Sequence, residues 1–252
     1  WSLRTGWTVE KIIFDFGMLC NHEHLVHSWT IDVGDRQIQN LFNSLEWNEI
    51  LTTNQKELPS IPKDLLNYFN SFRKKSILDL RKALYTQQPW QVNYDPKVHF
   101  DLEWVYLSIL SLIKEYEADT FKKPMLEVWY LVHCWSLIDK CFLNVKNLMV
   151  VRGEGMSLAS SNRKNEDRFV AAISKPARKC IGRKGDLVLR KSYIEFGGGE
   201  VGCKYEGKNG TKLLKERGLK LPKMLRDMLM LLCESIGNND KKVRQLEVIG
   251  YV

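Results

Sequence analysis

Apolar residues recur at helical spacing through three stretches of the first half of the chain. Residues 63–85, 101–117 and 125–142 each place large apolar side chains three or four positions apart, which predicts helices that bury one face. Residues 27–33 depart from this pattern, and their alternation of polar and apolar side chains predicts a short strand. The first half of the chain is therefore predicted to be mainly helical.

After residue 145 the pattern changes to short strands mixed with helices. Apolar runs predict strands at 148–151, 185–190, 193–203 and 245–252, a loop with a short helix at 157–165, and helices at 211–217 and 222–236. Three consecutive glycines, Gly197, Gly198 and Gly199, indicate a bulge or the close approach of another backbone. From residue 126 the predicted order is helix, three strands, helix, strand, an α/β arrangement in which a helix packs on a mixed sheet.

This change of pattern predicts two regions. We expect a mainly helical region over residues 1–124 and an α/β or α+β region over residues 125–252. The chain begins with Trp1, without an initiator Met or a signal peptide, and Val252 lies inside an expected strand. We therefore expect further residues at both ends.

The net charge of +8 favours a polyanionic partner, because each Lys or Arg that contacts a phosphate releases counterions. Basic residues are dense between Arg152 and Lys223, and sparser in the helical stretch before them. A basic surface that serves only solubility is the simpler alternative. We expect nucleic acid as the partner, DNA in preference to RNA, and a protein partner or a homodimer remains open.

The six cysteines contain no CxxC pair, which is typical of a reducing compartment. No apolar run reaches the roughly 18 residues that a membrane span needs. We therefore expect an intracellular protein, nuclear or cytoplasmic, with no membrane partner.

Two acidic residues lie on neighbouring predicted strands. Asp186 opens one strand, and Glu200 follows it on the next with Lys204 four positions later. On a regular strand Glu200 and Lys204 would share a face. Phosphodiester hydrolysis needs charge neutralised on the phosphate and an activated water, and Mg²⁺ held by carboxylates supplies both. The pair is therefore a candidate metal site.

The segment Gly182-Arg183-Lys184-Gly185-Asp186, followed by Glu200-Val201-Gly202-Cys203-Lys204, resembles the PD-(D/E)XK nuclease superfamily over residues 126–252. The resemblance implies an αβββαβ core, Mg²⁺ or Mn²⁺ held by Asp186 and Glu200, and Lys204 as the catalytic lysine. It also implies a third acid, either Glu127 or Glu154. The same region resembles a group of fungal proteins without an established activity.

The chain departs from the family motif at two positions. Gly185 stands in place of the proline, and Gly202 stands where the motif has its lysine, two residues before Lys204. Lys212 is therefore a second candidate for the catalytic lysine. The basic residues expected to hold phosphates are Arg163, Lys164, Arg183, Lys184 and Lys220.

The sequence predicts a metal-dependent nuclease that hydrolyses phosphodiester bonds of nucleic acid. The displaced lysine favours one alternative, an inactive module with the nuclease fold that binds nucleic acid or a protein. A purely helical interaction scaffold is another. Asp186 and Glu200 could also be surface acids paired with Arg190 or Lys191.

Three other groups could carry chemistry, and each has a plainer interpretation. Zinc ligands could come from a cluster that could equally be solvated or capping residues: Cys20, His22, His24 and His27. Cys134 beside His133 could be a hydrolase pair, but adjacent helical residues face different ways and a buried Cys is expected. The serines at 157, 160 and 161 could cap a helix or contact phosphate.

Overall fold

The computed structural model describes residues 1–169, 173, 175, 177–202, 206–207 and 210–252, and the side chain of Glu154 lies outside the described part. The chain is a mixed α/β protein that divides into two compact units. One unit combines residues 1–56 with 149–252, and the other is residues 57–148. This division does not coincide with the boundary at 124/125 expected from the sequence.

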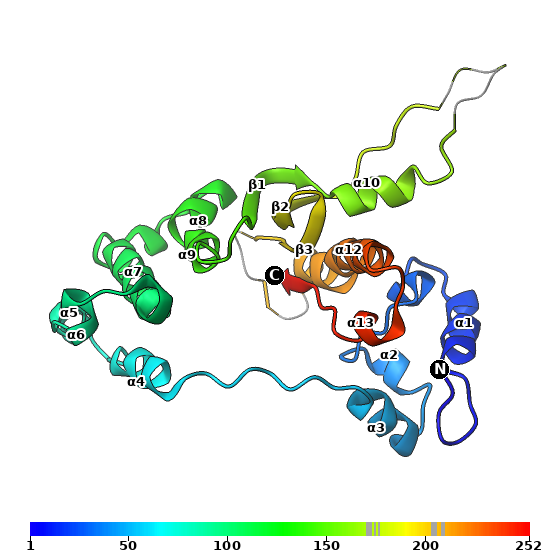
Figure 1. The fold of residues 1–252 in the computed structure, drawn as a ribbon, viewed down its shortest axis with the longest axis horizontal. Helices are drawn as coiled ribbons and strands as arrows, with labels where there is room; N and C mark the ends of the chain where they lie inside the picture. Colours follow the sequence, from blue (N-terminus) through cyan, green and yellow to red (C-terminus); the bar gives the residue numbers. More distant parts are fainter. Residues whose placement is uncertain (170–172, 174, 176, 203–205, 208–209) are drawn as a thin grey trace. The chain divides into compact units, whose positions relative to one another are not determined.

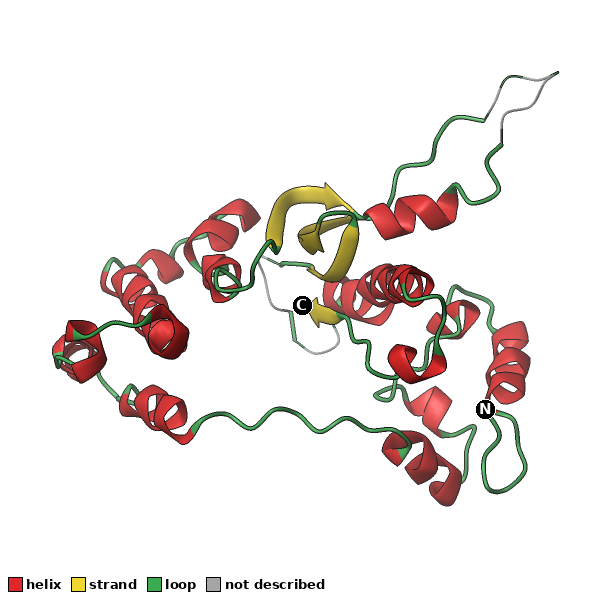
Figure 2. Cartoon of the chain, in the orientation of Figure 1, coloured by secondary structure: helices red, strands yellow, loops and turns green. Residues whose placement is uncertain are grey.

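The unit of residues 57–148 is helical (Figures 1 and 2). A core of Phe72, Leu84, Val105 and Ile113 holds it together. Its described elements are α4 (Lys63–Ser71), α5 (Ile77–Tyr85), α6 (Pro89–Val92), α7 (Pro96–Glu117), the 3₁₀ turn η2 (Thr120–Lys122), α8 (Glu127–His133) and α9 (Ser136–Cys141).

Two of the helices predicted in this unit are interrupted. The expected helix over 63–85 breaks after Ser71, and Ser76 starts α5 by accepting a hydrogen bond from the backbone N–H of Asp79 at 3.1 Å. The expected helix over 125–142 is divided into α8 and α9. The expected helix over 101–117 is confirmed, and Pro96 extends its start as a residue of the first turn.

The other unit begins with short helical elements packed around Val9, Ile13, Ile38 and Trp47. These elements are α1 (Val9–Leu19), the 3₁₀ turn η1 (Leu25–Ser28), α2 (Arg36–Gln39) and α3 (Ser44–Thr52). The strand expected over 27–33 is wrong. Trp29 has a left-handed backbone conformation with φ of 54°, which ends η1 and is incompatible with a strand.

The second stretch of this unit forms a mixed sheet with helices against it (Figure 2). The order of the described strands is β1-β2-β3-β4, antiparallel except that β3 and β4 run parallel. The elements are β1 (Met149–Met156), α10 (Leu158–Lys164), β2 (Lys184–Lys191), β3 (Ile194–Gly199), α11 (Thr211–Lys215), the π-helical turn η3 (Glu216–Lys220), α12 (Leu221–Ser235), α13 (Asp240–Val243) and β4 (Ile249–Tyr251).

Helix α12 covers the sheet and forms its main core (Figure 1). Met224 and Met228 of α12 are buried with Val188 of β2 and Ala159 of α10. The predicted strands and the final long helix are therefore present, although β4 is shorter than the expected 245–252.

The glycines of β3 permit a close approach of β4, one of the two interpretations that the sequence left open. A Cβ atom on Gly197 would lie 2.4 Å from the backbone oxygen of Ile249. The pairing of β2 with β3 also shifts register between Leu189 and Arg190. Both a close backbone and a bulge are thus present at this edge.

Polar contacts join the two stretches of this unit. Lys56 donates a hydrogen bond to the backbone oxygen of Leu246 at 2.9 Å, and Arg244 donates one to Asn54 at 3.2 Å. Helix α12 also packs against η1. These contacts explain why residues 1–56 group with the sheet and not with the helices that follow them. No helix in the described part of the chain is long and apolar enough to span a membrane.

Candidate functional site

Strand β2 brings Asp186 beside Glu200. The register pairs Leu187 with Gly199, so Asp186 lies opposite the residue that follows β3. The carboxylate of Asp186 accepts a hydrogen bond from the backbone N–H of Val201 at 2.8 Å. The two acids that are distant in sequence therefore meet at one end of the β2–β3 pair.

Glu200 lies just beyond β3 and not within it. The strand ends at Gly199, and the backbone N–H of Glu200 donates to the oxygen of Tyr251 in β4 at 2.9 Å. The regular strand therefore ends before Glu200, and the expectation that Glu200 and Lys204 share a strand face stays a prediction. Lys204 lies outside the described residues.

The carboxylate of Glu200 is almost completely buried, with 3% of the residue exposed. Its Oε2 atom accepts from Lys220 Nζ at 2.7 Å, while its Oε1 atom is buried and has no hydrogen-bond partner among the described residues. Burial raises the pKa of Glu200, and the hydrogen bond and charge of Lys220 offset this only in part. Burying a carboxylate oxygen costs free energy unless a hydrogen-bond donor or a cation contacts it.

Lys220 provides the positive charge at this site. It is the last residue of the π-helical turn η3, a type of element that often occurs at functional sites. Burial lowers the pKa of Lys220, but the hydrogen bond and charge of Glu200 outweigh burial and raise it, with help from Asp186 and Glu216. The ammonium group therefore stays charged beside three carboxylates.

Lys212 lies in the same region. Its Nζ atom donates to the backbone oxygen of Val201 at 3.2 Å and lies 3.9 Å from Glu216. Lys212, Glu216 and Lys220 are spaced four residues apart, so a continuous helical face was readable from the sequence. Lys220 and Glu216 were not expected at this site, because the helix predicted from the sequence ends at Arg217, before Gly218.

The donor set fits a hard divalent cation. Mg²⁺ commonly takes one or two carboxylates and retains several waters. Within the described part of the chain, Oε1 of Glu200 has no hydrogen-bond partner, and it lies near Asp186. Within the described residues, no group of three or more His, Cys, Asp or Glu side chains is arranged to hold a metal. A metal would therefore have a pair of protein carboxylates, with Glu216 acting as a nearby charge.

Two other acids were expected to contribute to the metal site. Glu127 begins α8 in the helical unit of residues 57–148. Glu154 lies on β1, but its side chain is outside the described part. A role for either acid at the metal site stays a prediction.

The basic residues expected to hold phosphates have several different surroundings. Arg163 pairs with Asp227 at 2.7 Å, and Lys164 donates to the backbone oxygen of Ile181 at 2.9 Å. Arg183 has a buried Nε atom with no hydrogen-bond partner in the described part of the chain, and Lys184 is exposed at the start of β2. Lys220 pairs with Glu200 and so lies within the acidic site, and its expected contact with phosphate stays a prediction.

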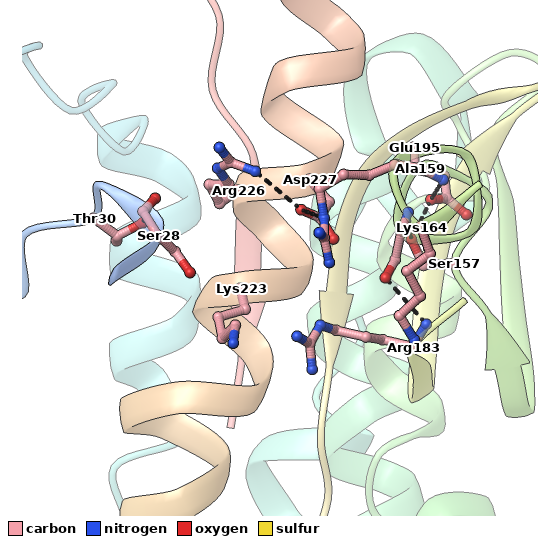
Figure 3. Close-up of polar contacts among 12 residues, drawn as sticks. Ser28, Thr30, Ser157, Ala159, Lys164, Arg183, Glu195, Lys223, Arg226 and Asp227 are labelled. Carbon is pink, nitrogen blue, oxygen red and sulfur yellow. Dashed lines mark hydrogen bonds and ion pairs between the residues drawn. The ribbon is translucent and has the colours of Figure 1, made fainter. Parts of the chain in front are cut away.

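The expected pairing of Asp186 or Glu200 with Arg190 is wrong, because Arg190 binds another acid. Its NH2 atom lies 2.7 Å from the buried Glu195. Glu195 also accepts from Ser157 Oγ at 2.7 Å and from the backbone N–H groups of Leu158 and Ala159 (Figure 3). Ser157 in turn caps α10 by accepting from the N–H of Ser160, so these residues stabilise a helix start.

The histidines near Cys20 also have structural roles. His24 contacts Asp35 at 2.9 Å, and His27 contacts the backbone oxygen of Gly17 at 2.9 Å. The two histidines cap η1 reciprocally, and the thiol of Cys20 donates to the oxygen of Phe16. Their arrangement agrees with the interpretation as capping residues.

The Cys134 thiol is a poor nucleophile. Burial raises its pKa, and the charge of Glu115 raises it further. The neighbouring His133 contacts Glu115 at 2.7 Å and stacks on Trp129. These contacts favour the structural interpretation of both residues.

The chain was compared with family models, curated proteins and solved structures. No family model, no curated protein and no solved structure matches this chain. The function is therefore inferred from the geometry of Asp186, Glu200 and Lys220.

Proposed function

We propose that the unit containing the sheet is a metal-dependent nuclease that hydrolyses phosphodiester bonds of nucleic acid. One observation carries this proposal: Glu200 has a buried oxygen near Asp186 with no hydrogen-bond partner among the described residues, and Lys220 donates to its other oxygen. The order of elements, a mixed sheet with acids at the ends of neighbouring strands, supports a core like that of the PD-(D/E)XK superfamily.

Each residue has a separate role in this proposal. Asp186 and Glu200 would hold Mg²⁺ or Mn²⁺, which when bound neutralises charge on the phosphate and makes a bound water more acidic. Lys220 fixes the orientation of Glu200 and supplies a positive charge near the reacting phosphate. Lys212 is the second candidate for this charge, because it lies on the oxygen of Val201 directly after Glu200.

One observation favours a non-catalytic module instead. The ion pair with Lys220 already compensates much of the charge of Glu200 without a metal. Such a module would bind nucleic acid or a protein through its basic residues and would cut nothing. Metal binding and cleavage separate the two candidates.

The test combines Mn²⁺ titration calorimetry with nicking of supercoiled plasmid in Mg²⁺ and Mn²⁺. We expect Asp186→Asn and Glu200→Gln each to abolish cleavage and to weaken Mn²⁺ binding. The matched control is Glu234→Gln, which removes an exposed carboxylate from α12 and should leave both unchanged. Binding of DNA without Mn²⁺ binding or nicking would refute the nuclease and favour the module.

A further inference from the structure

A second polar site lies on the same unit, between the segment around η1, helix α10 and helix α12. It is a pocket of about 350 Å³. The residues that carry the argument are Glu23, Trp29, Arg163, Lys223, Arg226 and Asp227. Figure 3 shows Ser28 and Thr30 facing the helix that presents Lys223, Arg226 and Asp227. A pocket of this size accommodates a ligand as large as a nucleotide.

The pocket has more cations than anions. Arg163, Lys223 and Arg226 line it, against Glu23 and Asp227. Lys223 is 13% exposed and pairs with Glu23, whose side chain is far more exposed. A phosphate could displace this exposed carboxylate and gain a largely desolvated ammonium group.

Asp227 holds the two arginines of the pocket in place. The residue is 4% exposed, and both arginines approach the same oxygen, Oδ1: Arg163 at 2.7 Å and Arg226 at 3.4 Å. The Oδ2 atom is buried, has no hydrogen-bond partner among the described residues, and has no surface open to the pocket. Asp227 therefore positions the two guanidinium groups for a negatively charged ligand and does not contact that ligand itself.

Trp29 provides an aromatic surface at the same pocket. Trp29 ends η1 in a left-handed conformation, and its indole ring stacks on Phe14, with ring centroids 6.3 Å apart and planes 14° apart. The residue nevertheless remains 55% exposed. An indole fixed on one side and open to solvent is suited to stacking of a nucleobase.

We propose that this pocket binds one unpaired nucleotide of a single-stranded nucleic acid. Trp29 stacks on the base, Lys223 and Arg226 bind the phosphate, and Asp227 holds Arg226 in place through its Oδ1 atom. This proposal rests on the proposed nuclease function, because it names the substrate of that nuclease as single-stranded or locally unpaired nucleic acid.

The position of the pocket on α12 fits this role. Lys220 directly precedes α12, and Asp227 lies seven residues further along. At about 1.5 Å of rise per residue the two are about 10 Å apart along the helix. That separation is of the order of one or two nucleotides of a single strand, so one chain could occupy both sites.

Binding is measured by fluorescence anisotropy of a labelled oligothymidylate in EDTA, where no metal-dependent cleavage occurs. Trp29→Ala and Arg226→Ala should each weaken binding roughly tenfold, and Trp29→Phe should retain most of it. The matched charge control is Lys241→Ala, an exposed lysine of α13, which should have little effect. Glu23→Gln should tighten binding, because the competitor for Lys223 is removed.

Two further probes test the mode of binding. A strand without bases should bind more weakly and should be insensitive to Trp29→Ala, and a duplex should bind more weakly than the single strand. Equal losses in Arg226→Ala and Lys241→Ala, equal binding of duplex and single strand, or no gain in Glu23→Gln would each overturn the proposal. Because binding is measured without metal, loss of nuclease activity in Glu200→Gln leaves this result unaffected, and the two proposals fail independently.

Discussion

The Nζ atom of Lys220 lies 2.7 Å from Oε2 of Glu200, across 20 residues of sequence. This contact joins the end of β3 to the start of α12 and leaves the other oxygen of Glu200 buried without a partner in the described part of the structure. The same pair therefore determines both the charge state of the site and the stability of the segment around it.

Lys220→Met should destabilise the protein at neutral pH. The change removes the partner of a buried carboxylate but retains much of the apolar stem of the side chain. Since Lys220 is 37% exposed, solvent screens part of the loss, and we expect about 1–3 kcal/mol in urea unfolding. The double variant with Glu200→Gln should recover most of this free energy, because no buried charge remains; no recovery would contradict the argument.

Protons should compete with the metal at an unusually high pH. Burial raises the pKa of Glu200, so its folded form retains a proton above the ordinary range of a glutamate. Mn²⁺ affinity should therefore rise with pH and level off above that raised pKa, since the ligand must be deprotonated. In Lys220→Met the loss of the ammonium raises the pKa further, so the rise should move to higher pH. Titration calorimetry between about pH 5 and 8 measures both curves; a flat affinity would exclude Glu200 as a ligand.

The same raised pKa predicts the sign of a stability effect. A carboxyl whose folded pKa is raised contributes most to stability below its ordinary pKa, and this contribution is lost as the pH rises through the folded value. Glu200→Gln in the Lys220→Met background should therefore gain stability relative to the single variant at neutral pH. The gain should vanish in acid, where Glu200 is already protonated, and unfolding curves at both pH values test this.

Glu195→Ala should lower the free energy of unfolding more than the substitution of any single acidic residue on the surface. The substitution leaves Arg190, Ser157 and two backbone N–H groups at the start of α10 without their acceptor. We expect a loss of about 3 kcal/mol or more in the free energy of unfolding. Glu247→Ala, which breaks an exposed pair with Lys56, should cost less than about 1 kcal/mol and serves as the control. Similar losses for the two variants would contradict the assigned role of Glu195.

Gly197→Ala should destabilise the junction of β3 and β4. Its Cβ would lie 2.4 Å from the backbone oxygen of Ile249, so the strands must separate, at a cost of about 2 kcal/mol or more. Gly218→Ala is the opposite case, because a Cβ there meets nothing within 4 Å and the residue lies in a helical turn. We expect Gly218→Ala to stabilise by up to about 1 kcal/mol. Chemical denaturation of both variants checks the difference in sign.

The periodicity of the chain was sufficient to predict most elements of the sheet region. Helix α12 buries Met224 and Met228 because apolar residues recur along one of its faces. Strand β2 contains an apolar run that lies between a glycine and basic residues. The points at which helices and turns end were harder to predict from the sequence. Ser76 begins a new helix inside a continuous apolar pattern, and the left-handed Trp29 ends a turn where a strand was expected.

By itself the sequence predicted the main strands and the long helix of the sheet region, the basic character of the chain, and the proximity of Asp186 and Glu200 at one end of neighbouring segments. These follow from local spacing, because strand and helix periods are properties of consecutive residues. Only the tertiary structure decided that Lys220 pairs with Glu200, that Arg190 binds Glu195, and that Trp29 and Arg226 line one pocket. Each of these contacts depends on where separate segments end and how they pack, and local spacing contains no information about that.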